Sequence, residues 1–288
     1  MIINNVLVIG GLGQLAQCVK SILDKDTPVD FNFIFLSSVD GDILNSEKLN
    51  DLFITHTPTY VINCAAYTAV DKAEDELEKA TDINLNGVRL LATCCKIFDA
   101  TLIHISTDFV FDGTKSFPLK EDDITNPLGV YGQTKLDGEI EIAKLMTSYY
   151  IIRTSWLYSE FGNNFVKTML KLSKDRDQLS VVCDQVGTPT YGIDLAKFLL
   201  FVIINNKKDY GLYHYSNEGV ASWYDFAHEI FSKDESFKLI PVNSEAYPTR
   251  AIRPKFSVLD KSKLKQTFSY SIPHWKESLI QCLAIINK

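Results

Sequence analysis

The chain has 288 residues, of which 46% are hydrophobic and 23% are charged, and its net charge is −7. This length and composition are ordinary for a globular protein built as one large domain or as two unequal lobes. The negative charge, with no block rich in Lys or Arg to offset it, argues against a general nucleic-acid-binding or anionic-membrane-binding protein.

The first strand, expected at residues 6–9, runs directly into a glycine-rich turn between Gly10 and Gly13. The helix that follows is expected over 14–23. Glycine permits positive φ and lets backbone N–H groups approach a ligand closely, and a helix N-terminus favours a pyrophosphate. With Ala16 as the third small residue, the spacing is a variant of the dinucleotide-binding fingerprint.

The second strand, Phe31–Leu36, ends in Ser37 instead of the acidic residue that would bind the adenosine ribose of NAD. Asp40 and Asp42 follow soon after, and no arginine stands beside them. Because serine tolerates a 2′-phosphate better than a carboxylate would, NADPH is favoured, with NADH as the alternative. The next helix is expected to have Ser46 as its N-cap.

Two more buried strands are expected at residues 60–64 and 102–105, with an amphipathic helix between them over 83–98. Helices between the strands predict an α/β fold with a Rossmann-like, doubly wound parallel sheet. Ligands of such sheets bind at the carboxyl ends of the strands. Ala65, Ala66 and Thr107 fall at those ends, as does the glycine turn. The two alanines either let a flat cofactor lie against the backbone or are simply tightly packed.

Tyr131 and Lys135 are four residues apart in a segment with helical character, so both side chains lie on one face. A phenol titrates near pH ~10 in water, and an ammonium group one turn away would lower this pKa. Together with Thr107 they form a candidate proton-transfer group. Taken alone, the same spacing also fits an ordinary helix surface.

The pattern loosens beyond residue 155 into a mixed, aromatic-rich half. Strands are expected near 179–183 and 213–217, and helices near 163–172, 192–204, 223–231 and from 274 onward. We therefore expect a dinucleotide-binding domain over 1–155 and a smaller, mainly substrate-binding mixed α/β lobe over 156–288. The helix near 192–204 is the part of that lobe that would pack back on the first domain.

Metal and membrane sites are not expected. The six cysteines form no C-x-x-C pair, and the five histidines are scattered. The longest apolar run, near 195–204, is too short to span a bilayer, and the first residues lack the basic region of a signal peptide. The expected location is cytoplasmic.

Stretches along nearly the whole chain resemble the extended short-chain dehydrogenase/reductases and, among them, the dTDP-4-dehydrorhamnose reductase family. The matching stretches are 10–16 (GGLGQLA), 65–73 (AAYTAVDKA), 106–113 (STDFVFDG), 131–135 (YGQTK), 153–158 (RTSWLY), 187–194 (GTPTYGID), 253–260 (RPKFSVLD) and 273–275 (PHW). The chain departs from the family pattern at Phe109, where tyrosine is usual, and at Ala16, which replaces the third glycine.

The resemblance implies NADPH-dependent reduction of the C4 keto group of dTDP-4-dehydro-L-rhamnose to dTDP-L-rhamnose. Tyr131 would donate the proton, and Thr107 would orient the carbonyl. Lys135 would lower the pKa of the tyrosine and hold the nicotinamide ribose. Besides Tyr131 and Lys135, cofactor contacts are expected from Gly10, Gly13, Gln14, Leu15, Ser37, Asp42, Ile43, Cys64, Ala65, Ala66 and Tyr67. Substrate contacts are expected from Thr107, Phe109, Trp156, Asn164 and Arg253.

Three of these substrate contacts have structural alternatives. Trp156 either stacks on a sugar ring or packs in the core. Arg253 either binds the diphosphate with both nitrogens or forms a surface ion pair. Asn164 either reaches the substrate or belongs to a helix N-terminus whose N-cap is Asn163 or Asn164.

Alternative functions on the same scaffold stay open. One is another sugar-nucleotide 4-ketoreductase or epimerase with a UDP-linked substrate. Another is a non-catalytic NADP-binding regulatory subunit, like that of methionine adenosyltransferase. A 4,6-dehydratase would have an acidic pair after the threonine, and here Asp108 is followed by Phe109, which counts against dehydration. The sequence leaves the oligomeric state, including a homodimer, undetermined.

Overall fold

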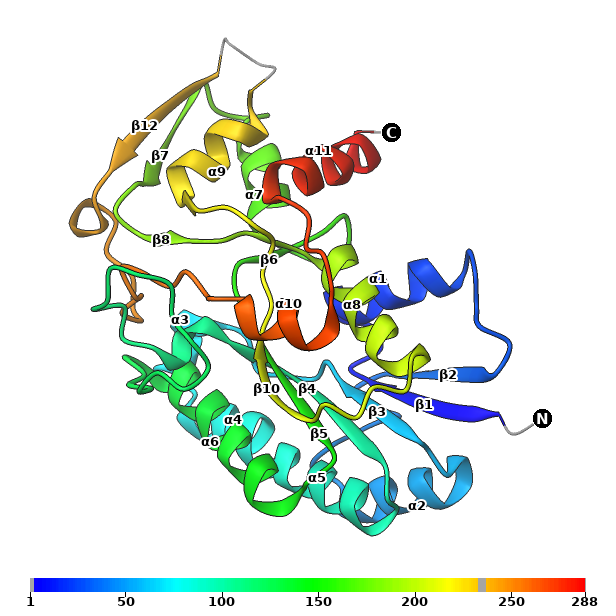
Figure 1. The fold of residues 1–288 in the computed structure, drawn as a ribbon. Coiled ribbons are helices and arrows are strands. Elements are labelled where there is room, and N and C mark those ends of the chain that lie inside the picture. The colour runs from blue at the N-terminus through cyan, green and yellow to red at the C-terminus, as the bar shows by residue number, and fades with distance from the viewer. Residues whose placement is uncertain (1–2, 233–236, 288) are drawn as a thin grey trace.

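A six-stranded parallel sheet forms the centre of the computed structural model, which describes residues 3–232 and 237–287 (Figure 1). The strand order is β10-β5-β4-β3-β1-β2. The strands are β1 (Asn4–Ile9), β2 (Phe31–Leu36), β3 (Tyr60–Asn63), β4 (Thr101–Thr107), β5 (Tyr149–Thr154) and β10 (Gly211–His214). The order reverses at β1, which makes its carboxyl end a topological switch point. The predicted doubly wound parallel sheet is thereby confirmed. The outermost residues of the two expected domains, 1–2 and 288, lie outside the described residues.

Helices cover both faces of the sheet, so its strands are apolar on both sides. Val6 and Val8 of β1 face one core with α1 (Gln14–Leu23) and α8 (Gly192–Ile204). Leu7 and Ile9 face the other core with α2 (Ser46–His56), α5 (Val88–Ile97) and α6 (Val130–Leu145). All four side chains are fully buried, so each of these consecutive positions of β1 holds an aliphatic residue.

Two local expectations need correction. The N-cap of α2 is Asn45 and not Ser46, because the Asn45 side chain accepts a hydrogen bond from Lys48 N at 3.0 Å. The helix expected near 83–98 is divided into a π-helical segment, Asp82–Gly87, and α5. Two short helices, α3 (Val70–Ala73) and α4 (Leu77–Thr81), precede it.

The second half of the chain forms a third core beside the sheet. The backbone of this region lies in the upper part of Figure 1. Phe226 and Trp275 are fully or almost fully buried at its centre. Besides α8 and β10, the helices and strands of this half are β6 (Leu157–Tyr158), α7 (Phe165–Leu172), β7 (Gln178–Val182), β8 (Val186–Gly187), β9 (Thr190–Tyr191), β11 (Ala221–Ser222), α9 (Trp223–Ile230), β12 (Lys238–Val242), α10 (Ser262–Phe268) and α11 (Trp275–Ile286).

The second half also completes the central sheet. Strand β10 pairs in parallel with β5, and Tyr213 packs against Phe268 of α10 with ring centroids 5.0 Å apart. Helix α8 packs along α1. The division into domains at residue 155 stays a prediction, and the segment expected at 213–217 supplies an edge strand of the main sheet. In the stretches 3–232 and 237–287 no helix is long and apolar enough to cross a membrane.

Candidate functional site

A cavity of about 470 Å³ opens at the carboxyl ends of β1, β3, β4 and β5. Many of the residues predicted from the sequence meet here, although they come from distant parts of the chain. The predicted residues that line this cavity are Gly13, Gln14, Leu15, Cys64, Ala65, Ala66, Thr107, Phe109, Tyr131, Lys135 and Trp156. The strand-end position inferred for the site is therefore the position of a real cavity.

The glycine turn after β1 fits the pyrophosphate of a dinucleotide. Gly10 has a φ of +74°, and a Cβ on it would lie 2.8 Å from the backbone N of Ala65. Gly13 is the N-cap of α1, and no side chain caps that helix end. The first N–H groups of an α-helix have no partner within the helix, so those of α1 are free to bind an anion.

Gly10 and four other predicted cofactor contacts are not among the residues that line this cavity. The Ser37 hydroxyl accepts from Asp40 N at 3.1 Å and lies 2.7 Å from the Asp40 carboxylate. The Asp42 side chain accepts from Leu44 N at 3.0 Å. Ile43 is buried in the second core, and the Tyr67 hydroxyl donates to Glu76 at 3.1 Å.

Thr107 ends strand β4, and its hydroxyl accepts from Phe109 N at 3.2 Å. The same hydroxyl lies 3.3 Å from Oδ1 of Asp108. Two buried oxygens beside the cavity, Oδ2 of Asp108 and Oγ of Ser106, find no hydrogen-bond partner among the described residues. Burial raises the pKa of Asp108 to about 6.

Tyr131 projects from the first turn of α6. Burial raises its pKa to about 12, the Asp108 charge acts in the same direction, and a hydrogen bond with the Thr107 side chain opposes both. We expected Lys135 to lower this pKa. In the structure burial dominates the shift, the amine of Lys135 is bound to other groups, and an effect of Lys135 on this pKa stays a prediction.

The amine of Lys135 is turned toward strand β4. Its Nζ donates to the backbone O of Ile105 at 2.6 Å and lies 3.2 Å from Nε2 of His104. Only 2% of the residue is exposed. Burial lowers the pKa of Lys135 to about 8, although the charge of Glu139 opposes that shift.

Trp156 lines the cavity and packs against the third core, and Asn164 directly precedes helix α7 of that core. Trp156 has a φ of +47°, and its ring stacks on Trp223 with centroids 3.6 Å apart. Such strained backbone tends to occur at functional sites. Asn164 is the N-cap of α7, as its structural alternative required, and its Nδ2 also donates to Gln14 Oε1 at 2.8 Å.

Arg253 lies outside the main cavity. It forms an ion pair with both carboxylate oxygens of Asp71, at 2.7 and 3.1 Å, in accordance with its structural alternative. It lines a separate cavity of about 310 Å³ that also contacts Trp223, the tryptophan stacked on Trp156. Arg250 nearby pairs with Asp75.

Several residues that line the main cavity were not among the site residues predicted from the sequence. They are Asn63, Thr68, Val70, Ile105, Ser106, Asp108, Thr154, Ser155, Leu157 and Asn163. Asn63, Ser106 and Thr154 stand in the last two positions of β3, β4 and β5, so the strand-end rule applied to every strand would have found them. His104 is fully buried, does not line the cavity, and belongs to no sequence motif that would mark it as functional.

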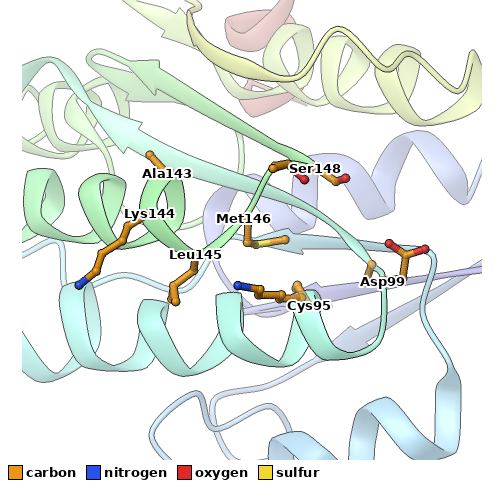
Figure 2. Close-up of a pocket in the computed structure, with 10 residues that line it drawn as sticks. Cys95, Asp99, Ala143, Lys144, Leu145, Met146 and Ser148 are labelled. Atoms are coloured by element: carbon orange, nitrogen blue, oxygen red, sulfur yellow. The ribbon is translucent and has the colours of Figure 1, made fainter.

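A third cavity, also of about 310 Å³, lies at the opposite edge of the sheet, between the ends of α5 and α6 (Figure 2). Cys95, Lys144 and Met146 are among its lining residues. Ligands of doubly wound sheets bind at the carboxyl ends of the strands, where the main cavity lies, and not at this edge. Among residues 3–232 and 237–287, no group of three or more His, Cys, Asp or Glu is arranged to hold a metal ion.

Comparison with known proteins identifies the family. Residues 4–287 match the family model described as RmlD substrate binding domain. The dTDP-4-dehydrorhamnose reductase of Aggregatibacter actinomycetemcomitans is 39% identical over 95% of this chain and 96% of its own. A crystal structure of a dTDP-4-dehydrorhamnose reductase from Clostridium acetobutylicum has a TM-score of 0.94 and 42% identity, covering 99% of this chain and all of the other. A Bacillus anthracis dTDP-4-dehydrorhamnose reductase solved in complex with NADP has a TM-score of 0.93 and 35% identity, with the same coverage.

Proposed function

Since the chain belongs to the dTDP-4-dehydrorhamnose reductase family, we propose that it uses NADPH to reduce the C4 keto group of dTDP-4-dehydro-L-rhamnose. The product is dTDP-L-rhamnose. The observation that carries this proposal is the meeting of Thr107, Tyr131 and Lys135 in one cavity behind an uncapped helix N-terminus. That arrangement combines a dinucleotide-binding turn with a proton donor.

The glycine turn and the first N–H groups of α1 would hold the pyrophosphate of NADPH. When bound, the cofactor supplies the hydride that goes to C4 of the sugar. Lys135 would hold the nicotinamide ribose, which requires its amine to exchange a present partner for a ribose hydroxyl. Ala65 lies against Gly10, so this part of the wall is backbone and small side chains.

Tyr131 would supply the proton that balances the hydride. Because burial raises its pKa to about 12, the phenol keeps its proton at neutral pH. The hydroxyl of Thr107 would orient the C4 oxygen, and Tyr131 would donate to that oxygen as the C–H bond forms. A C4 ketone thereby becomes a C4 alcohol.

Trp156 would form a flat wall for the sugar ring, supported by its stacking on Trp223. Arg253 would bind the diphosphate only by leaving Asp71, its partner in this structure. Phe109 would contact the sugar through apolar ring atoms alone.

The experiment is a substrate panel with purified protein, following the loss of NADPH absorbance. The panel contains dTDP- and UDP-linked 4-keto-6-deoxy sugars, each with NADPH and with NADH. We expect the fastest oxidation with NADPH and dTDP-4-dehydro-L-rhamnose. No oxidation with this pair would overturn the proposal, and cofactor binding without turnover on any sugar would indicate a regulatory subunit instead.

A further inference from the structure

A buried histidine connects two strands of the sheet to Lys135. His104 on β4 and Asn63 on β3 are Cα partners, and both side chains are almost completely buried. Nδ2 of Asn63 lies 3.0 Å from Nδ1 of His104, and Nζ of Lys135 lies 3.2 Å from Nε2. One imidazole therefore bridges the asparagine amide and the lysine amine.

The orientation of the Asn63 amide is fixed by the backbone. Its Oδ1 accepts from Ala65 N at 3.1 Å, and a backbone N–H can only donate. The NH₂ group of Asn63 therefore faces His104. Because NH₂ is a donor, Nδ1 of His104 must be the acceptor.

A neutral imidazole that accepts at Nδ1 carries its hydrogen on Nε2. Burial, together with the nearby Lys135, holds the pKa of His104 well below its usual value, so the ring is neutral. Its Nε2–H then points at Nζ of Lys135. An ammonium group offers only donors and would oppose this N–H, whereas an uncharged amine accepts from Nε2–H and still donates to Ile105 O.

We propose that His104 is a positioning residue for Lys135, and that its Nε2–H donates to the uncharged amine and disfavours the ammonium form in the protein without cofactor. The place of Lys135 in a reaction rests on the proposed function. The hydrogen-bond arrangement itself rests only on the contacts given above.

The charged groups around Lys135 do not reverse this arrangement. The carboxylate whose charge acts on Lys135 is Glu139, one turn further along α6. Arg153 of β5 holds it through contacts of 2.7 to 3.1 Å. Cys64 has a pKa raised to about 12 by burial, so its thiol is uncharged. Within the described part of the chain, Lys135 has no carboxylate in an ion pair with it.

The first test determines the tautomer of His104. Protein labelled with ¹⁵N-histidine is studied by NMR without cofactor between pH 6 and 9, and the His104 signals are assigned by their loss in His104→Gln. We expect a neutral ring protonated at Nε2 above about pH 8, where the Lys135 amine is mostly uncharged and can accept from it. A ring protonated at Nδ1 in that range, or an imidazolium, would overturn the proposal.

The second test follows the Lys135 amine with ¹³C-labelled lysine, assigned by its loss in Lys135→Arg. His104→Gln can turn an amide oxygen toward the ammonium, so the titration midpoint of Lys135 should rise by about one pH unit or more. His214→Gln is the matched control, because this buried histidine bonds to Leu119 O and does not contact Lys135. An unchanged midpoint in folded His104→Gln would refute the role.

Asn63→Asp provides a second variant of nearly the same shape. A carboxylate can only accept, so it should bond both Ala65 N–H and a hydrogen on Nδ1 of His104. Nε2 then becomes an acceptor for the lysine ammonium, and the tautomer should switch. No switch would contradict the arrangement. All three measurements are made without cofactor or substrate, so an inactive protein would overturn the proposed function and leave these results standing.

Discussion

The ring of Phe109 packs edge-on against the ring of Tyr131, with centroids 5.5 Å apart and planes at 73°. Gly132 makes this approach possible, because a Cβ at that position would clash with the backbone O of Phe109. The start of α6 therefore lies directly on the turn after β4. This contact brings the phenol of Tyr131 to the hydroxyl of Thr107.

Gly132→Ala tests this close approach. Alanine normally stabilises a helix interior by about 1 kcal/mol relative to glycine. Here the clash should prevail, and we expect the free energy of unfolding to fall by about 1–3 kcal/mol, the usual cost of overpacking. Urea unfolding measures the change. Exposed Gln133→Ala on the same helix is the control and should stay within about 0.5 kcal/mol of the parent protein. A more stable Gly132→Ala protein would contradict the tight contact.

Tyr131→Phe tests the proton donor. Removing the phenol hydroxyl should lower kcat by about 10²-fold or more, the scale of general acid catalysis, because the C4 oxygen loses its proton source. Fluorescence titration with NADPH should show unchanged affinity, since the glycine turn is intact. Tyr149→Phe, remote from the cavity at the start of β5, is the control and should keep its activity. Full activity of Tyr131→Phe would remove the tyrosine from the mechanism.

The sequence predicted those parts of the site that depend on local chain geometry. Gly10 and Ala65 follow strands and Thr107 ends one. The aliphatic pattern marks these strand ends, and parallel pairing then brings them together. The positions of Arg253 and Asn164 depend on partners far along the chain, Asp71 and Gln14. No local pattern encodes such pairs.

The sequence likewise does not predict where a charged side chain points within the fold. Four-residue spacing places Tyr131 and Lys135 on one helix face, but it does not show where the amine points. His104, which binds that amine, lies on another strand and is entirely buried. Strand β10 likewise looks like part of a separate lobe until its pairing with β5 is seen.

Asp108→Asn tests the buried carboxyl group beside the cavity. Burial raises the pKa of Asp108 to about 6, whereas an unfolded aspartate titrates near pH ~3.9. The folded protein thus binds this proton more tightly, and the resulting stabilisation is complete below about pH 4 and is lost as the pH rises through about 6. Asparagine cannot lose a proton, so the variant should gain stability relative to the parent across this window, by roughly 3 kcal/mol at most.

Thermal or urea unfolding at intervals between pH 4 and 8 measures this difference. Asp112→Asn is the matched control, because hydrogen bonds from Thr114 lower the pKa of Asp112. For this group the stabilisation is present above the unfolded pKa, so the control variant should lose stability relative to the parent as the pH rises from the acid side. An Asp108→Asn difference that does not vary with pH would show that the carboxyl group is not shifted.

Glu139→Gln tests the buried ion pair behind Lys135. Glu139 and Arg153 are 5% and 4% exposed in their side chains and are joined through Oε2 and Nη2 at 2.7 Å. Glutamine keeps the shape but leaves the guanidinium without a counter-charge in the core. We therefore expect the free energy of unfolding to fall by about 3–5 kcal/mol. Glu141→Gln breaks the neighbouring pair with Lys144, whose side chain is 70% exposed, and should cost no more than about 1 kcal/mol. Equal losses in the two variants would mean that burial does not distinguish these pairs.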